Sequence, residues 1–211
     1  MSQFDIFYVR HADTVSTFDD RDKSDVNLSE LGEKQIKLLG ERFKGKSFDA
    51  VFSSPMVRAV KTAAAVCEQL DGHPQLEILP QLVENKTTRK YFGTGEEYLK
   101  NYYDNIIVNH DMPLFFRNVR DIDNDIRCKK IIKYLKERFT YGQKIIIFAH
   151  GSLGNHFIPK AVGMPHGNYV LSLNHTGVTK IKYTPDGKQR ISFMNDISHL
   201  RPLTENYEFD L

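Results

Sequence analysis

Residues 4–14 read Phe-Asp-Ile-Phe-Tyr-Val-Arg-His-Ala-Asp-Thr. The first six residues are rich in β-branched and aromatic side chains, which is typical of a short buried strand. Arg10 and His11 follow this strand directly, and in open α/β sheets ligands bind just beyond the carboxyl ends of strands. A cation and a titratable nucleophile at that point suit an anionic ligand. The alternative is a strand that simply ends in polar residues, and this stretch alone does not decide between the two.

Strand-like and helix-like segments alternate along the rest of the chain. Apolar residues recur at helical spacing in residues 28–43, where Ser29 is a candidate N-cap and Gly45 is expected to end the helix. A second helix is predicted at residues 56–70. The other strand-like runs are residues 49–52, 76–79, 144–149, 178–183 and 190–193.

The segment 121–139 predicts a long helix with acidic residues at its start and basic residues at its end, which matches the helix dipole. Its apolar face is expected to carry Ile122, Ile126, Ile132, Leu135 and Phe139. The run Lys-Ile-Ile-Ile-Phe-Ala at residues 144–149 is almost continuously apolar, which is typical of a central strand covered on both faces. Pro-Asp-Gly at residues 185–187 predicts the turn of a closing β-hairpin.

Alternating strands and helices with a terminal hairpin predict a three-layer α/β/α sandwich, whose central sheet is mostly parallel with one antiparallel element. With 211 residues and no linker-like tract, we expect a single domain that spans residues 1–211. Residues 86–118 are the most irregular part, rich in Tyr, Phe and basic side chains. We interpret them as an insertion within that domain.

The composition argues against several classes of protein. The formal net charge is +2 and acids and bases are interspersed, whereas nucleic-acid-binding proteins usually carry a clustered basic face. No apolar run approaches a membrane span and no signal peptide is recognisable, so we expect a soluble cytoplasmic protein without a membrane partner. Cys67 and Cys128 are then reduced, and both are predicted to fill the core rather than form a redox pair.

One motif match is rejected by its context. Residues 40–47, Gly-Glu-Arg-Phe-Lys-Gly-Lys-Ser, fit the phosphate-loop pattern G-x-x-x-x-G-K-[ST]. Such a loop follows a strand and opens a helix, so that backbone amides and the helix dipole face the phosphates. Here a predicted helix precedes the match and a predicted strand follows it. We therefore do not expect a nucleoside triphosphatase.

Three separated segments share one arrangement, in which a strand is followed at once by small or polar residues. They are residues 9–11, 52–58 and 148–151. In a parallel sheet all three ends lie on one edge. The charged and titratable residues expected at that edge are Arg10, His11, Arg58 and His150. The helix that starts after Gly151 is expected to add backbone N–H groups to the same place.

These residue types suit phosphoryl transfer. Guanidinium groups bind phosphoryl oxygens through paired N–H donors and keep their charge. Imidazole can attack phosphorus at neutral pH without a metal. The negative charge on the transferring group then needs fixed donors, which the second histidine and both arginines can supply.

Four motifs stand in order along the chain. Residues 10–14 read Arg-His-Ala-Asp-Thr, and residues 28–35 read Leu-Ser-Glu-Leu-Gly-Glu-Lys-Gln. Ser-Ser-Pro-x-x-Arg-Ala-x-x-Thr-Ala is present in full at residues 53–63, and Ala-His-Gly stands at residues 149–151. Together they resemble the motifs of the histidine phosphatase superfamily, also called the phosphoglycerate mutase-like family. The similarity continues through residues 174–200 and so spans nearly the whole chain.

The resemblance implies roles for individual residues. His11 is expected to be the nucleophile that becomes phosphohistidine. The groups implied around the phosphoryl group are Arg10, Arg58, His150 and the backbone at Gly151. No metal and no cofactor are implied.

The resemblance also implies an acid. The family's proton donor is usually a glutamate in a Leu-x-Glu segment, which residues 82–84 match, so Glu84 is the candidate. The alternative for Glu84 is an exposed surface charge, and Glu96 and Glu97 are weaker candidates for the acid. Thr17 stands where the family commonly has asparagine, and its hydroxyl can still donate to phosphate.

We expect a metal-independent phosphatase for a small phosphorylated substrate. A phosphoglycerate mutase is one alternative, although the basic residues of the insertion do not match the set with which mutases clamp a carboxylate. A non-catalytic module that binds a phosphorylated ligand is another, and the retained histidines and arginines argue against it. The aromatic insertion at residues 86–118 is expected to cap the site, with ordinary core packing as the alternative. The oligomeric state stays open, with a homodimer as one alternative.

Overall fold

The computed structural model describes residues 4–15, 25–84, 95–111, 121–165 and 170–203. Its strands are β1 (Phe4–Arg10), β2 (Ala50–Ser53), β3 (Leu76–Ile78), β4 (Ile106–Val108), β5 (Gln143–Ala149), β6 (Val178–Tyr183) and β7 (Gln189–Asp196). Its α-helices are α1 (Glu30–Phe43), α2 (Val57–Cys67), α3 (Glu96–Leu99), α4 (Asp121–Arg138) and α5 (Gly151–Ala161). Two short 3-10 helices, η1 (Pro80–Leu82) and η2 (Ser198–Leu203), complete the described elements.

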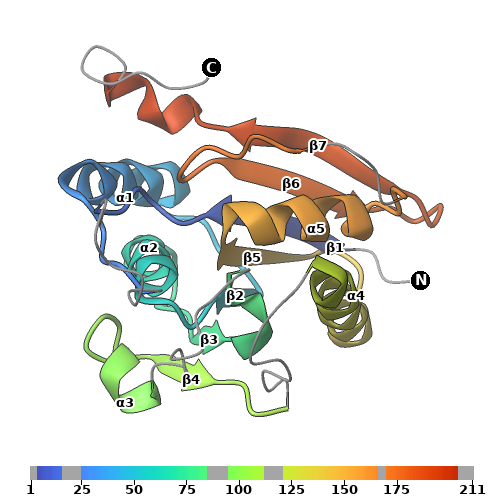
Figure 1. The fold of residues 1–211 in the computed structure, drawn as a ribbon, viewed down its shortest axis with the longest axis horizontal. Helices are drawn as coiled ribbons and strands as arrows, with labels where there is room; N and C mark the ends of the chain where they lie inside the picture. Colours follow the sequence, from blue (N-terminus) through green and yellow to red (C-terminus); the bar gives the residue numbers. More distant parts are fainter. Residues whose placement is uncertain (1–3, 16–24, 85–94, 112–120, 166–169, 204–211) are drawn as a thin grey trace.

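The strands form one sheet in the order β4-β3-β2-β5-β1-β6-β7 (Figure 1). All pairings among β1 to β5 are parallel, whereas β6 runs antiparallel to both β1 and β7. This arrangement confirms the predicted mostly parallel sheet with one antiparallel element. It also confirms that the chain closes with a β-hairpin.

Helices cover the sheet on both faces. α4 and α5 pack on one face, together with alternate strand residues such as Ile145 and Ile147. α1 and α2 pack on the other face, together with Ile146 and Phe148. Because β5 is apolar on both sides, it can lie in the middle of the sheet with neither face in water. The three predicted layers are visible in Figure 1.

Both predicted ends of α1 are confirmed. Ser29 is the N-cap, and its Oγ accepts a hydrogen bond from the Gly32 N–H at 3.0 Å. Gly45 follows the C-cap with a φ of 65°, a left-handed conformation that glycine adopts without strain. The phosphate-loop pattern at residues 40–47 thus lies at the end of a helix. A phosphate loop would lie before a helix, so its rejection is confirmed. Cys67 and Cys128 are buried and free, which confirms that both fill the core.

The described part of the insertion extends the sheet. It contains α3 and β4, and β4 pairs in parallel with β3. β4 was not predicted from the sequence, because its three residues lie in the irregular segment 86–118, where no periodic pattern marks a strand. Leu99, Tyr103 and Ile106 belong to the core on the face of α1 and α2. Residues 86–94 and 112–118 lie outside the described residues, so the cap over the site stays a prediction.

The buried face of α4 differs from the predicted one. Ile126 is 43% exposed, whereas Asn124, Arg127 and Cys128 are buried. The other described members of the predicted face are buried, namely Ile132, Leu135 and Phe139. The polar residues are tolerated because Arg127 Nη2 donates to Asn124 Oδ1 at 2.7 Å and Nη1 donates to the Val83 carbonyl at 2.7 Å. Periodicity alone cannot anticipate such a paired polar group inside a core.

Gly32 lies where α1 passes close to the chain that follows β1. A Cβ at Gly32 would stand 2.1 Å from the backbone oxygen of Asp13, which accepts a hydrogen bond from the Ser29 N–H at 3.1 Å. We expect Gly32→Ala to lower the free energy of unfolding by about 1–3 kcal/mol, the usual cost of overpacking, in a urea titration. Gly95→Ala is the matched control, because a Cβ there meets no atom within 4 Å. Equal stability of the two variants would contradict the close contact.

Candidate active site

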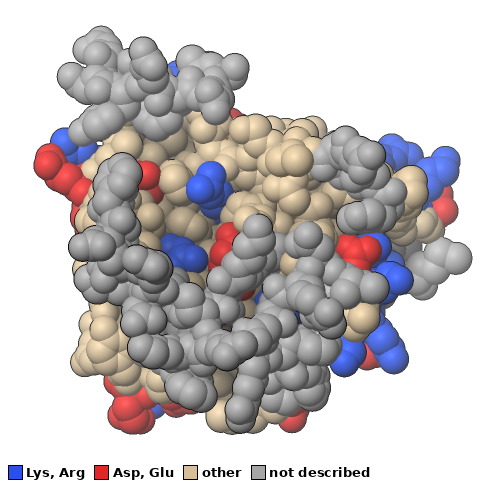
Figure 2. Space-filling view, in the orientation of Figure 1, with Lys and Arg blue, Asp and Glu red and all other residues tan. Residues whose placement is uncertain are grey.

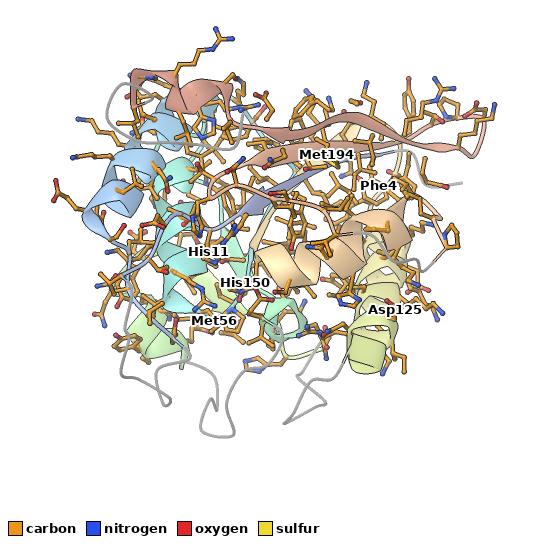
Figure 3. All side chains as sticks on the ribbon, turned by 45° about the horizontal axis from the view of Figure 1, so that its top comes forward. Phe4, His11, Met56, Asp125, His150 and Met194 are labelled. Atoms are coloured by element: carbon orange, nitrogen blue, oxygen red, sulfur yellow. The ribbon has the colours of Figure 1, made fainter. Side chains whose placement is uncertain are left out.

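Three neighbouring strands end at one edge of the sheet. Arg10 at the end of β1 pairs with Ala149 at the end of β5, and Ser53 at the end of β2 pairs with Phe148. The residues that follow these strands are His11, His150 and Ser54. The imidazole rings of the two histidines lie 5.1 Å apart, centroid to centroid. Figure 3 shows both rings between α2 and α5, so the convergence expected from the sequence is present.

The hydrogen bonds of His11 define which nitrogen can act as a nucleophile. Nδ1 lies 2.7 Å from the carbonyl oxygen of Ala12, which can only accept, so Nδ1 carries the proton. On the other side of the ring, Arg58 Nε donates to Nε2 at 3.2 Å. Burial, followed by the charge of Arg58, holds the pKa of His11 well below its usual value. His11 is therefore a neutral imidazole whose Nε2 lone pair faces a guanidinium.

Arg58 is positioned by the start of α2. It is the second residue of that helix, and its side chain is buried beside His11. Nη2 donates to the sulfur of Met56 at 3.2 Å, and Nη1 lies 3.9 Å from Asp25 Oδ1. The same Asp25 oxygen accepts a hydrogen bond from the Val57 N–H at 2.8 Å. The carboxylate thus binds the helix N-terminus and attracts the guanidinium at the same time.

Arg10 is held by the segment that precedes β6. Nη1 donates to the Leu173 carbonyl at 2.5 Å, and Nη2 donates to His175 Nε2 at 2.7 Å. Gly151 permits this placement, because a Cβ there would stand 3.3 Å from Arg10 Nε. His175 Nδ1 in turn lies 3.3 Å from Asp13 Oδ1, so neutral His175 links the guanidinium to a carboxylate.

His175 was missed by sequence reasoning. Its ring lies 5.3 Å from the ring of His11, and burial followed by the charge of Arg10 lowers its pKa to about 4. A signal was available in the predicted antiparallel element. The amino end of an antiparallel strand lies at the same edge as the carboxyl ends of its parallel neighbours, and Val178 pairs with Val9. Residues just before β6 were therefore candidates for the site.

His150 is fully buried at the start of α5. Its backbone oxygen accepts a hydrogen bond from the Tyr8 hydroxyl at 2.7 Å, and its Nε2 lies 2.8 Å from Ser54 Oγ. Burial, followed by the charge of Arg58, holds the pKa of His150 well below its usual value. Both site histidines on the parallel strands are consequently neutral at neutral pH.

Glu84 lies at the N-terminus of α5. Its carboxylate accepts hydrogen bonds from the backbone N–H groups of Leu153 at 3.1 Å and Ser152 at 3.3 Å. Arg127 holds the preceding residue through the Val83 carbonyl. The placement brings Glu84 next to His150–Gly151, but it also uses backbone N–H groups that were expected to be available to the ligand. Two amides at the start of α5 that the sequence analysis expected to bind the phosphoryl group bind Glu84 instead.

The weaker candidates lie elsewhere. Glu96 Oε2 accepts a hydrogen bond from the Val108 N–H at 3.1 Å, and its other oxygen pairs with Lys100 at 3.0 Å, so this carboxylate links α3 to β4. Glu97 is exposed on α3. Thr17 lies outside the described residues, and its role stays a prediction.

Figure 2 shows blue and red atoms close together near the middle of one face, bordered by tan and grey atoms. Among the described residues, no group of three or more His, Cys, Asp or Glu side chains is arranged to hold a metal ion.

The sequence pattern of the histidine phosphatase superfamily (branch 1) matches residues 6–197. The chain belongs to this family. A provisionally named phosphoserine phosphatase 2 of Hydrogenobacter thermophilus is 25% identical over 214 residues, which cover 94% of this chain and 98% of the relative. The mitochondrial serine/threonine-protein phosphatase Pgam5 of Drosophila virilis is 25% identical over 198 residues. That match covers 90% of this chain but only 62% of the relative.

The same fold is also seen in solved structures. YhfR of Bacillus stearothermophilus superposes with a TM-score of 0.68 at 19% identity, covering 94% of this chain and 100% of that chain. Within the described part of this family member, none of the helices combines the length and apolarity needed to cross a bilayer.

Acid should destabilise this protein through its buried histidines. Burial followed by the charge of Arg42 lowers the pKa of His199 to about 4, close to the value for His175. Below the ordinary pKa of 6.5, the unfolded chain binds protons that these folded imidazoles exclude. The free energy of unfolding therefore falls as pH falls, by about 1.4 kcal/mol per pH unit for each such histidine.

Urea titrations between about pH 6.5 and pH 5 measure this slope. His199→Gln removes one titrating group, so its slope should be shallower than that of the parent chain by up to about 1.4 kcal/mol per pH unit, with the full difference reached towards about pH 5. An unchanged slope in His199→Gln would contradict a depressed pKa at this position.

Proposed function

We propose that this protein is a metal-independent phosphatase that hydrolyses a small phosphomonoester through a phosphohistidine on His11. The observation that carries the proposal is the state of the His11 ring. Its Nδ1–H donates to the Ala12 carbonyl, which leaves the Nε2 lone pair 3.2 Å from a buried guanidinium. Phosphatase names among the relatives, including the phosphoserine phosphatase 2, support the reaction class.

In the first half of the reaction, His11 Nε2 attacks phosphorus as the bond to the substrate oxygen breaks. Negative charge on the phosphoryl oxygens is stabilised by N–H donors from Arg58, Arg10 and His150. The reaction starts with Glu84 as a carboxylic acid, and the departing oxygen takes its proton, so that the leaving group is an alcohol rather than an alkoxide. Glu84 is then a carboxylate and His11 is a phosphohistidine.

In the second half, water attacks the phosphohistidine. The Glu84 carboxylate takes a proton from that water, and the phosphorus–nitrogen bond breaks to release phosphate and restore neutral His11. The low pKa of His11 supports this cycle, because the ring starts as the nucleophilic neutral form without first losing a proton. The two arginines retain their charge throughout both steps.

His11→Ala should abolish phosphoenzyme formation. We expect wild-type protein that is incubated with a labelled phosphoester and quenched to carry acid-labile, base-stable label, and His11→Ala to carry none. Its kcat should fall by a factor of about 10³ or more, since removal of a nucleophile costs at least that much in comparable enzymes. His73→Ala is the matched control, because His73 is exposed and bonded to Asp104 at 2.9 Å away from the site. Hydrolysis by His11→Ala at the native rate would refute the mechanism.

The same assay separates a phosphatase from a phosphoglycerate mutase. A phosphatase releases inorganic phosphate from the labelled enzyme in water, whereas a mutase returns the group to a phosphoglycerate and responds to 2,3-bisphosphoglycerate. We expect phosphate release that is insensitive to this compound and to EDTA. Stimulation by the bisphosphate with isomerised product would favour the mutase.

Glu84→Gln should affect substrates according to their leaving groups. An alkyl phosphate has a basic leaving group that needs a proton, so we expect its kcat to fall by about 10²–10⁴. An aryl phosphate with an acidic phenol needs little proton donation and should lose far less. Glu97→Gln is the control, because Glu97 carries an equivalent carboxylate that is exposed on α3. Equal losses for both substrates would argue that Glu84 is not the acid.

A further inference from the structure

Ser54 and His150 form a buried pair beside the proposed nucleophile. Neither residue is accessible to solvent, and Ser54 Oγ lies 2.8 Å from His150 Nε2. Within the described residues, His150 Nδ1 is a buried atom without a hydrogen-bond partner. A neutral imidazole carries its proton on only one of the two nitrogens, so the bond to Ser54 bears on which nitrogen that is.

The hydroxyl of Ser54 can take part in this bond in two ways. If it donates to Nε2, its proton is satisfied, and the imidazole proton stands on Nδ1. If it accepts from Nε2–H, the hydroxyl proton needs another acceptor, and in the described structure the bonds of Ser54 Oγ are to His150 and to the Met56 N–H at 3.3 Å, which is a donor. The second arrangement leaves two buried groups unsatisfied, the hydroxyl proton and the Nδ1 lone pair, whereas the first leaves only the Nδ1–H, so the first is favoured.

Only the first arrangement provides a donor for an anion. With the proton on Nδ1, the otherwise unpartnered nitrogen is an N–H group inside the site. With the proton on Nε2, the same nitrogen would present a lone pair, which repels a phosphoryl oxygen. Because the pKa of His150 is low, the ring carries one proton at neutral pH, so only one of its two nitrogens can be a donor.

We propose that Ser54 is a positioning residue that keeps the proton of His150 on Nδ1, from where it donates to a phosphoryl oxygen during transfer to His11. This inference rests on the proposed function. The centroids of the His11 and His150 rings lie 5.1 Å apart, so the two imidazoles are neighbours in the site (Figure 3). A donor fixed before the reaction needs no reorganisation as charge develops on the oxygen.

A pair of serine variants provides the kinetic test. Ser54→Ala should lower kcat by about 10- to 100-fold while KM changes by less than about two-fold, because a transition-state donor is lost. Ser53→Ala is the matched control. Ser53 is equally buried and also loses a hydroxyl, but that hydroxyl donates to the Ser54 carbonyl at 2.9 Å and not to a histidine. Equal losses in the two variants, or none in Ser54→Ala, would overturn the proposal.

The position of the proton can be read directly by ¹⁵N NMR of the histidine rings at about pH 8, with His150 assigned by its absence from His150→Gln. We expect the wild-type protein to carry the proton on Nδ1 with Nε2 unprotonated. In Ser54→Ala the proton should shift toward Nε2, and Ser54→Thr, which keeps a hydroxyl, should restore both the Nδ1 proton and kcat. A merely structural serine would not move the proton.

A wild-type spectrum with the proton on Nε2 overturns the inference, and it does so even if Ser54→Ala does not fold. The two proposals fail separately. A wild-type protein that forms no phosphohistidine refutes the proposed function, whereas the position of the His150 proton is measured in the free protein.

Discussion

Parallel pairing of β1 and β2 on either side of β5 is the constraint on which the site depends. Residues 145–148 of β5 are buried alternately against the two helical layers. A slip of one residue in the register would turn every one of these side chains to the opposite face, so the apolar core holds the register firmly. The core therefore fixes where the three strands end relative to one another. His11, Ser54 and His150 meet because the strands before them cannot slide.

The same burial divides the basic groups at this edge into two kinds. A guanidinium keeps its charge when it is desolvated. Arg58 is held in place by the Asp25 carboxylate, and Arg10 by hydrogen bonds to His175 and to a backbone carbonyl. An imidazole responds to desolvation and to a nearby cation by losing its proton, which is what lowers the pKa of His11 and His150. One environment thus produces fixed cations and a neutral ring, which are the groups that the proposed mechanism requires.

Much of the fold and site could be read from contiguous residues. Ser29 caps a helix because its own hydroxyl reaches an amide three residues away, and β5 is central because its own side chains are apolar on both faces. The site residues stand where strands end or helices begin, namely Arg10, His11, Arg58 and His150. Parallel pairing of the strands is enough to bring these positions to one edge of the sheet. By contrast, Ile126 was assigned to the wrong face of α4, since a buried Arg127 bonded to the Val83 carbonyl leaves no trace in apolar periodicity.

The sequence by itself determined the order of strands and helices outside residues 86–118, the edge at which the motifs meet, and the family, because these depend on local periodicity and on short motifs. Only the tertiary structure decided the partners of those residues. Arg10 contacts His175 across 165 positions of the chain, and Ser54 contacts His150 across 96. Glu84 accepts hydrogen bonds from the start of α5. Such pairings depend on how whole layers pack, which a single segment does not reveal. They bear on which nitrogen of His150 carries the proton and on which amides of α5 already bind Glu84.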